Sequence, residues 1–155
     1  MNIAYLKKLR DYPVRNPNAT ELRGEIEGLP LSEIEQLETN WNNGNPFPKS
    51  LRELLFLAGE YCYVLDYGAY DSLDQIQEYK REDLLEYHNI TINRPYFIID
   101  VYGGNITFVY LDESQEDPTV HYIEKYSPLV IGNSRLLSKY IEAGIENVKK
   151  GYNPF

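Results

Sequence analysis

Residues 95–111 read PYFIIDVYGGNITFVYL and carry the clearest structural signal in the sequence. Two runs rich in β-branched and aromatic residues, 95–102 and 105–111, flank the dipeptide Gly103-Gly104. Such runs favour strands, and two glycines between them favour a tight turn. The stretch therefore predicts a β-hairpin. Thr119–Ile123 has the same composition and is predicted to add a third strand to the same sheet.

Helical signals lie upstream of the hairpin. Ser32 and Glu35 have the spacing of a capping box, which predicts a helix that begins at Ser32 and ends at Asn42-Asn43-Gly44. A second helix is predicted from Pro48, because proline is tolerated in the first turn, where its missing N–H costs nothing. Gly59 stands where a C-terminal cap glycine is expected.

Four further segments complete the secondary structure. The spacing of apolar residues predicts a short helix over 3–11 and an irregular approach with a short strand over 13–30. Tyr61–Leu65 is rich in β-formers and predicts a strand. A helix is predicted to begin at Asp71-Ser72 and run through Leu85, and a last helix to run from a cap at Ser134 to Lys150. Helices, then strands, then a helix indicate an α+β fold.

The length of 155 residues fits a single domain over 1–155, with a mainly antiparallel sheet and helices packed mostly on one side. No apolar run approaches the ~20 residues of a membrane span, and the first residues lack the apolar core of a signal peptide. Cys62 is the single cysteine, which excludes an internal disulfide and a cysteine-rich zinc site. We therefore expect a cytoplasmic protein.

Charge is distributed unevenly along the chain. The formal net charge is −9, and residues 24–134 hold 20 acidic and 6 basic side chains. Both ends are mildly basic. This balance argues against nucleic acid as a direct partner, because nucleic-acid binding depends on lysine and arginine displacing counterions from phosphates. The excess of acidic side chains has two interpretations that stay open at this point. It keeps the protein soluble, or it forms a docking face for a basic partner.

The sequence carries no recognisable catalytic motif. His88 and His121 lack metal-ligand spacing, and Cys62 has no positive neighbours that would activate its thiol. Asp100 and Asp112 are the one catalytic option, as a carboxylate pair for a metal-dependent hydrolase. The simpler interpretation places Asp100 on the solvent face of a half-exposed strand and Asp112 in a turn. We expect no enzymatic activity, no cofactor and no bound metal.

Tyrosine is the second unusual feature of the composition, with 15 residues. Tyrosine gives large contact area with few rotatable bonds and is enriched at protein interfaces, although it also packs well in sheets. Several tyrosines are interleaved with acidic residues between positions 66 and 86, and an acidic loop follows the hairpin. The candidate partner-binding residues are therefore Asp66, Tyr67, Tyr70, Asp71, Asp74, Glu78, Asp112, Glu113, Glu116 and Asp117.

The order of these elements resembles the SUKH superfamily, which contains bacterial toxin-immunity proteins and a fungal regulator of cell-wall synthesis. The matching stretches are Leu31–Trp41, Phe47–Gly59, the hairpin Tyr96–Leu111 and the helix Ser134–Lys150. The likeness thus spans about residues 31–150, and its motifs are structural. The family has no shared active site whose residues could be transferred to this chain.

The resemblance implies an immunity protein that binds and neutralises a cognate toxin, often a nuclease domain of a polymorphic or contact-delivered toxin. A monomer or weak dimer without membrane contact is expected. The acidic composition agrees with this, because nucleases are commonly basic where they hold phosphates. The alternative, implied by the fungal branch, is a scaffold or regulatory adaptor that binds protein partners. A toxin gene next to this gene would favour immunity.

Overall fold

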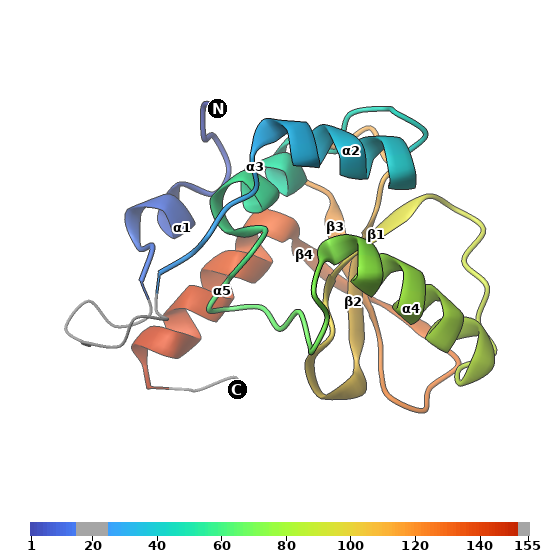
Figure 1. Ribbon diagram of the computed structural model, residues 1–155. Coiled ribbons are helices and arrows are strands. Elements are labelled where there is room, and N and C mark those ends of the chain that lie inside the picture. Colours follow the sequence, from blue (N-terminus) through green and yellow to red (C-terminus); the bar gives the residue numbers. More distant parts are fainter. Residues whose placement is uncertain (15–24, 152–155) are drawn as a thin grey trace.

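The computed structural model describes residues 1–14 and 25–151, and within them the predicted hairpin forms half of a four-stranded antiparallel sheet (Figure 1). Strand order in the sheet follows the chain. The strands are β1 (Tyr96–Asp100), β2 (Ile106–Tyr110), β3 (Thr119–Ile123) and β4 (Val130–Leu136). A one-turn 3-10 helix, η1 (Tyr102–Gly104), connects β1 to β2, and Gly103 and Gly104 both have positive φ there. Glycine is favoured at such positions because it has no Cβ.

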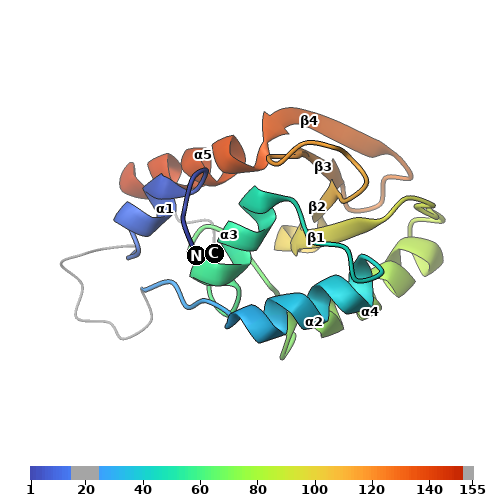
Figure 2. The same cartoon turned by 90° about the horizontal axis from the view of Figure 1, so that it is seen from above.

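Five helices accompany the sheet in the described residues. They are α1 (Lys7–Asp11), α2 (Leu31–Trp41), α3 (Lys49–Ala58), α4 (Leu73–Glu86) and α5 (Leu137–Lys149). Contacts run from α1 to α5, from α5 to α3 and from α3 to α2, and α5 also packs on β3 and β4. Figure 2 shows this helical group beside the sheet. The predicted α+β class with an antiparallel sheet is confirmed.

The core lies between α3, α5 and the sheet. Leu51, Leu54 and Leu55 of α3 are at most 2% exposed, and so are Phe97 and Ile98 of β1. All five residues of β1 are buried, so both faces of this strand are covered. None of the helices in the described part of the chain is long and apolar enough to cross a membrane.

The predicted strand Tyr61–Leu65 is wrong. Only Tyr61 forms an isolated bridge, with Glu27, and the chain then turns. Tyr63 is buried and donates a hydrogen bond of 2.8 Å from its hydroxyl to the carbonyl of Tyr12. The β-forming residue types at this segment therefore serve packing between loops and do not join a sheet.

The start of the last helix is also different from the prediction. Ser134 lies in β4 with φ of 58°, and α5 begins three residues later at Leu137. The register between β3 and β4 shifts at this point, from His121↔Gly132 to Thr119↔Leu136. Local sequence suggested a serine cap, whereas pairing with β3 extends the strand through it.

Two predicted caps differ from the expectation: the Ser32 cap is absent, and Gly59 is the C-cap of α3 but lacks the left-handed conformation. Pro30 occupies the N-cap position of α2, so Ser32 lies inside the first turn and makes no cap hydrogen bond. Gly59 follows α3 with a right-handed φ of −71°, so it is not a left-handed cap. A Cβ there would lie 2.6 Å from the Cγ of Leu29 and from the carbonyl oxygen of Leu55. Close packing, rather than backbone conformation, requires glycine at this position.

The other predicted segments can be compared with the structure one by one. The short helix predicted over 3–11 is present only over its second half, as α1, and a bridge joins Val14 to Glu25. Most of the irregular approach predicted over 13–30 lies outside the described residues. The remaining helices, predicted at 32–41, 48–58 and 72–85, match α2, α3 and α4 within about two residues, the usual uncertainty of helix ends.

Candidate functional site

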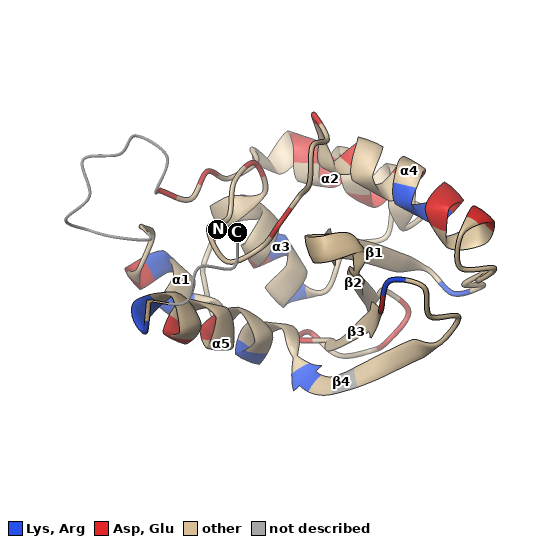
Figure 3. Ribbon diagram, turned by 90° about the horizontal axis from the view of Figure 1, so that it is seen from below, with Lys and Arg blue, Asp and Glu red and all other residues tan. Residues whose placement is uncertain are grey.

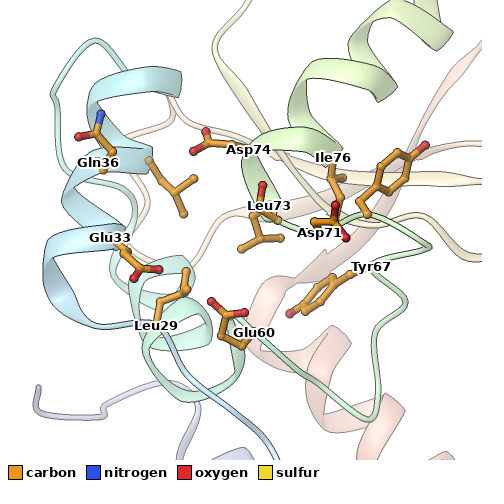
Figure 4. Close-up of a pocket in the computed structure, with 13 residues that line it drawn as sticks. Leu29, Glu33, Gln36, Glu60, Tyr67, Asp71, Leu73, Asp74 and Ile76 are labelled. Atoms are coloured by element: carbon orange, nitrogen blue, oxygen red, sulfur yellow. The ribbon is translucent and has the colours of Figure 1, made fainter.

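A pocket of about 140 Å³ opens between α2, the end of α3 and the beginning of α4 (Figure 4). Three separate parts of the chain meet there, namely α2 with its preceding loop, the turn after α3, and the loop that leads into α4. Its lining residues are Leu29, Glu33, Gln36, Leu37, Gly59, Glu60, Tyr67, Tyr70, Asp71, Ser72, Leu73, Asp74 and Ile76.

Hydrogen bonds hold the loop that forms one wall of this pocket. The Tyr67 hydroxyl donates to the carbonyl of Ala58 over 2.8 Å, which ties the loop to the end of α3. Ser72 is the N-cap of α4, and its hydroxyl accepts a hydrogen bond from the backbone N–H of Gln75. The Ser72 cap was predicted, and it fixes where α4 begins and therefore where Asp71 stands at the rim.

The floor of the pocket is apolar and its wall is aromatic. Leu29, Leu37, Leu73 and Ile76 are at most 7% exposed. Tyr67 contributes a ring from the wall, and burial raises the pKa of its hydroxyl well above the ordinary value. The hydroxyl is therefore uncharged at neutral pH and acts as a hydrogen-bonding group.

The rim of the pocket is acidic. Glu33, Glu60 and Asp71 are exposed, and none of the salt bridges within residues 1–14 and 25–151 involves them. Figure 4 shows the carboxylates of Glu33 and Glu60 facing a common space. Asp74 differs, because its carboxylate accepts hydrogen bonds from the Trp41 indole and the Asn40 amide. Among the described residues no lysine or arginine lines the pocket, so the three exposed carboxylates are not compensated there.

Carboxylates elsewhere in the described chain are often paired. Arg94 makes a bidentate contact with Asp112, with the shortest N–O distance at 2.6 Å, and lies 3.4 Å from Glu113. The hydrogen bond from Arg94 lowers the pKa of Asp112. Figure 3 shows acidic positions dominating α2 and α4, whereas α1 and α5 carry both acidic and basic positions. Uncompensated negative charge is thus concentrated around α2 and α4.

The structure brings together four of the ten predicted partner-binding residues, Tyr67, Tyr70, Asp71 and Asp74, in this pocket. The other six are elsewhere. Glu78 is exposed further along α4, and Glu116 is exposed in the loop after β2. Asp112 and Glu113 contact Arg94, and Asp66 accepts a hydrogen bond from Gly68 and lines a different cavity.

Asp117 has a structural role instead of the predicted contact role. Its side chain is buried, and its two carboxylate oxygens accept hydrogen bonds from the backbone N–H and the hydroxyl of Ser138, at 3.0 and 2.6 Å. Ser138 lies in the first turn of α5, where N–H groups lack partners within the helix. Asp117 therefore caps α5, and its carboxylate is not exposed for contact with a partner.

Sequence reasoning missed Glu33 and Glu60, which contribute much of the rim. They are 27 residues apart in the chain and belong to different elements, so no local pattern connects them. The available signal was the absence of basic residues in α2, which left Glu33 and Glu35 without helical ion-pair partners three or four residues away. The convergence itself depends on tertiary packing of α2 on α3.

The proposed carboxylate pair Asp100 and Asp112 does not form. Asp100 is opposite Thr107 near the connection between β1 and β2, whereas Asp112 follows the other end of β2. The strand positions from Thr107 to Tyr110 alone correspond to about 10 Å, and Asp112 lies beyond them. Asp100 is also buried, contrary to the expected solvent-facing position. No group of three or more potential metal-ligating side chains comes together in the described residues.

A second cavity of about 180 Å³ contains Asp100 together with Asp66, Arg135 and Tyr140. The Asp100 carboxylate accepts hydrogen bonds from the backbone N–H of Asp66 and from the Tyr140 hydroxyl, at 2.9 and 3.1 Å. Burial raises the pKa of Asp100 to about 6. These bonds join the loop at Asp66 and α5 to the end of β1, which is an internal structural role.

Cys62 is buried, and burial raises the pKa of its thiol to about 12. The thiolate is the nucleophilic form of cysteine, so this side chain is unreactive at neutral pH.

Comparison with known proteins adds no further constraint on the site: no family model, no curated protein and no solved structure matches this chain.

Proposed function

We propose that this chain is a cytoplasmic immunity protein that binds and neutralises a cognate bacterial toxin, a basic nuclease domain, without catalysing a reaction of its own. The observation that carries the proposal is the set of uncompensated carboxylates, Glu33, Glu60 and Asp71, around a pocket with a tyrosine wall. Surface carboxylates keep many proteins soluble, but carboxylates with only that role need not converge on a pocket.

Electrostatics explains how such a surface would work. A nuclease that holds phosphates carries a positive field over its active-site cleft. A negatively charged partner is steered toward that cleft, which raises the association rate, and it then covers the surface that nucleic acid would use. Tyrosines beside the charges supply apolar contact area with little loss of side-chain entropy.

The placement of the reactive side chains supports a binding role. Asp100 and Asp112 are at opposite ends of the hairpin, and the Cys62 thiol is buried with a raised pKa. The buried polar side chains described above bind backbone and side-chain groups of the chain itself. The carboxylates of Glu33, Glu60 and Asp71, in contrast, are exposed around the pocket, where a partner could contact them.

A co-expression experiment tests the proposal. If a toxin domain is encoded beside this gene, cells that express it should survive with the wild-type chain and die with a variant that carries Glu33→Lys, Glu60→Lys and Asp71→Lys. The matched control carries Glu25→Lys, Glu86→Lys and Glu124→Lys, which changes the net charge equally at exposed positions outside the pocket.

The control variant should protect as well as the wild type. Equal protection by both triple variants would show that the pocket rim is not the contact surface. A purified complex that leaves the toxin fully active would contradict neutralisation and favour the adaptor function instead.

A further inference from the structure

The pocket between α2, α3 and α4 combines three features in one hollow. Its floor is aliphatic, one wall is a tyrosine ring, and its rim carries carboxylates. A flat acidic surface would attract any cation, whereas a hollow with an apolar floor selects for shape. We propose that this pocket receives a single long cationic side chain, lysine or arginine, that projects from the toxin. The proposal rests on the proposed function and identifies the anchor of that interface.

The size of the pocket suits a side chain. A volume of about 140 Å³ is much larger than a single water or ion requires. Lysine and arginine have apolar stems that favour contact with hydrocarbon surface while the charged group stays near solvent. Leu73 and Ile76 at the floor match the stem, and Glu33 and Glu60 at the rim match the charged end.

The carboxylates at the rim are available for such a contact. Arg52 pairs with Glu38, Lys80 pairs with Asp83, and Arg81 stacks between the rings of Trp41 and Tyr96. Arg52, Lys80 and Arg81 are therefore engaged with other groups of the chain. A cation from outside would complete the charge balance at Glu33, Glu60 and Asp71.

The tyrosine wall adds a second attraction. A cation over the face of an aromatic ring is stabilised by the ring quadrupole, by about 0.5–2 kcal/mol depending on exposure. Tyr70 already stacks on Tyr79 with ring centroids 5.9 Å apart, which fixes the outer part of the wall. Tyr67 is fixed by its hydrogen bond to Ala58. The wall is thus in place before a partner binds, so little side-chain entropy is lost on binding.

The test uses small probes, so it does not depend on the toxin. The full chain labelled with ¹⁵N is titrated with Nα-acetyl-lysine methylamide, with the arginine analogue, and with the norleucine analogue, which keeps the stem but lacks the charge. The cationic probes should bind with millimolar dissociation constants. They should shift the amide signals of Gly59, Glu60 and Leu73, and norleucine should shift them much less.

Charge-neutral variants provide the control. Glu33→Gln with Glu60→Gln should weaken binding of the cationic probes by about tenfold or more, because the rim charges are removed while the shape is kept. Glu35→Gln with Glu86→Gln, both exposed and outside the pocket, should bind like the wild type. Equal shifts with norleucine, or equal binding by both double variants, would overturn the proposal.

Failure of this inference differs from failure of the proposed function. Probe binding by the wild type together with full toxin protection by the Glu33→Gln and Glu60→Gln variant would overturn the anchor role and leave immunity intact. Probe binding without protection by the wild type would overturn immunity. The expected result is that the Glu33→Gln and Glu60→Gln variant loses both probe binding and toxin protection, whereas the wild type keeps both.

Discussion

Glu53 lies in the middle of α3 with its side chain fully buried. Its two carboxylate oxygens accept hydrogen bonds from the backbone N–H groups of Ala4, Tyr5 and Leu6, at 2.7 to 2.9 Å. These N–H groups precede α1 and have no partner within that helix. A single acidic side chain therefore pins the N-terminal segment onto the core.

Replacing Glu53→Gln should lower the free energy of unfolding by about 2–3 kcal/mol. The amide places an NH₂ group against a backbone N–H donor, so one buried donor loses its acceptor. Urea denaturation monitored by circular dichroism measures the change. Glu35→Gln, which is exposed on α2, is the control and should change stability by less than about 0.5 kcal/mol. Equal effects of the two substitutions would contradict the pinning role.

Asp100 makes stability depend on pH. Its pKa is raised from 3.8 to about 6, chiefly by burial and against the hydrogen bonds that favour the carboxylate. The folded state therefore binds the proton more tightly than the unfolded state. The resulting stabilisation is complete below about pH 4 and is lost as the pH rises through about 6, with a span of up to about 3 kcal/mol.

The Asp100→Asn variant should therefore gain stability relative to wild type as the pH rises. We expect the difference in unfolding free energy between variant and wild type to become more positive by about 2–3 kcal/mol from about pH 4 to about pH 7.5. Urea titrations at both pH values measure it, with Glu124→Gln as an exposed control. A difference that stays constant, or that changes in the opposite direction, would show that burial does not dominate at Asp100.

At the scale of elements, α4 protects the free edge of the sheet. β2 pairs with one side of β1, and the Gln77 side chain bonds both the N–H and the carbonyl of Ile98 on the other side, at 2.8 and 2.9 Å. Arg81 donates to the carbonyl of Tyr96 over 2.6 Å. Unpaired strand edges favour aggregation, and here helix side chains take the place of a fifth strand.

The Gln77→Met substitution keeps the volume of the side chain but leaves Ile98 without these partners. It should reduce the free energy of unfolding by about 2–4 kcal/mol, because two buried backbone groups lose hydrogen bonds. It should also increase light scattering on mild heating. Gln36→Met on the exposed face of α2 is the comparison substitution. Unchanged stability and scattering for Gln77→Met would remove the edge-protecting role.

Local sequence rules identified most elements but failed where pairing partners decide the structure. The hairpin was predictable because both strands and their turn are contiguous. Tyr61–Leu65 has strand-like residues but only Glu27 opposite, so it forms one bridge. β4 contains Gly132 and Ser134, which disfavour a strand locally, and it forms because β3 pairs with it.

The candidate site was partly predictable for the same reason. Tyr67, Tyr70, Asp71 and Asp74 lie close together in the chain, so their composition was visible in one window. Glu33 and Glu60 reach the pocket only through the packing of other elements, which no local pattern encodes. Charge pairing was equally hidden, since Arg94 and Asp112 are 18 residues apart yet form a bidentate contact.

At the scale of the whole molecule, the charge of the chain separates into two regions. The basic terminal segments meet where α1 contacts α5, and Lys8 pairs with Glu146 at 2.7 Å. The uncompensated acidic groups gather around α2 and the start of α4. The molecule is thus electrostatically polarised, which would orient it as it approaches a basic partner.

The association rate with the proposed toxin partner, measured by stopped-flow fluorescence across a range of NaCl concentrations, tests this polarity most directly. We predict a rate constant that falls steeply as salt rises, and that falls further at low salt when Glu33, Glu60 and Asp71 are replaced by their amides. A rate constant that is independent of both salt and these three charges would contradict the claim that a negatively charged pocket guides and holds a basic protein.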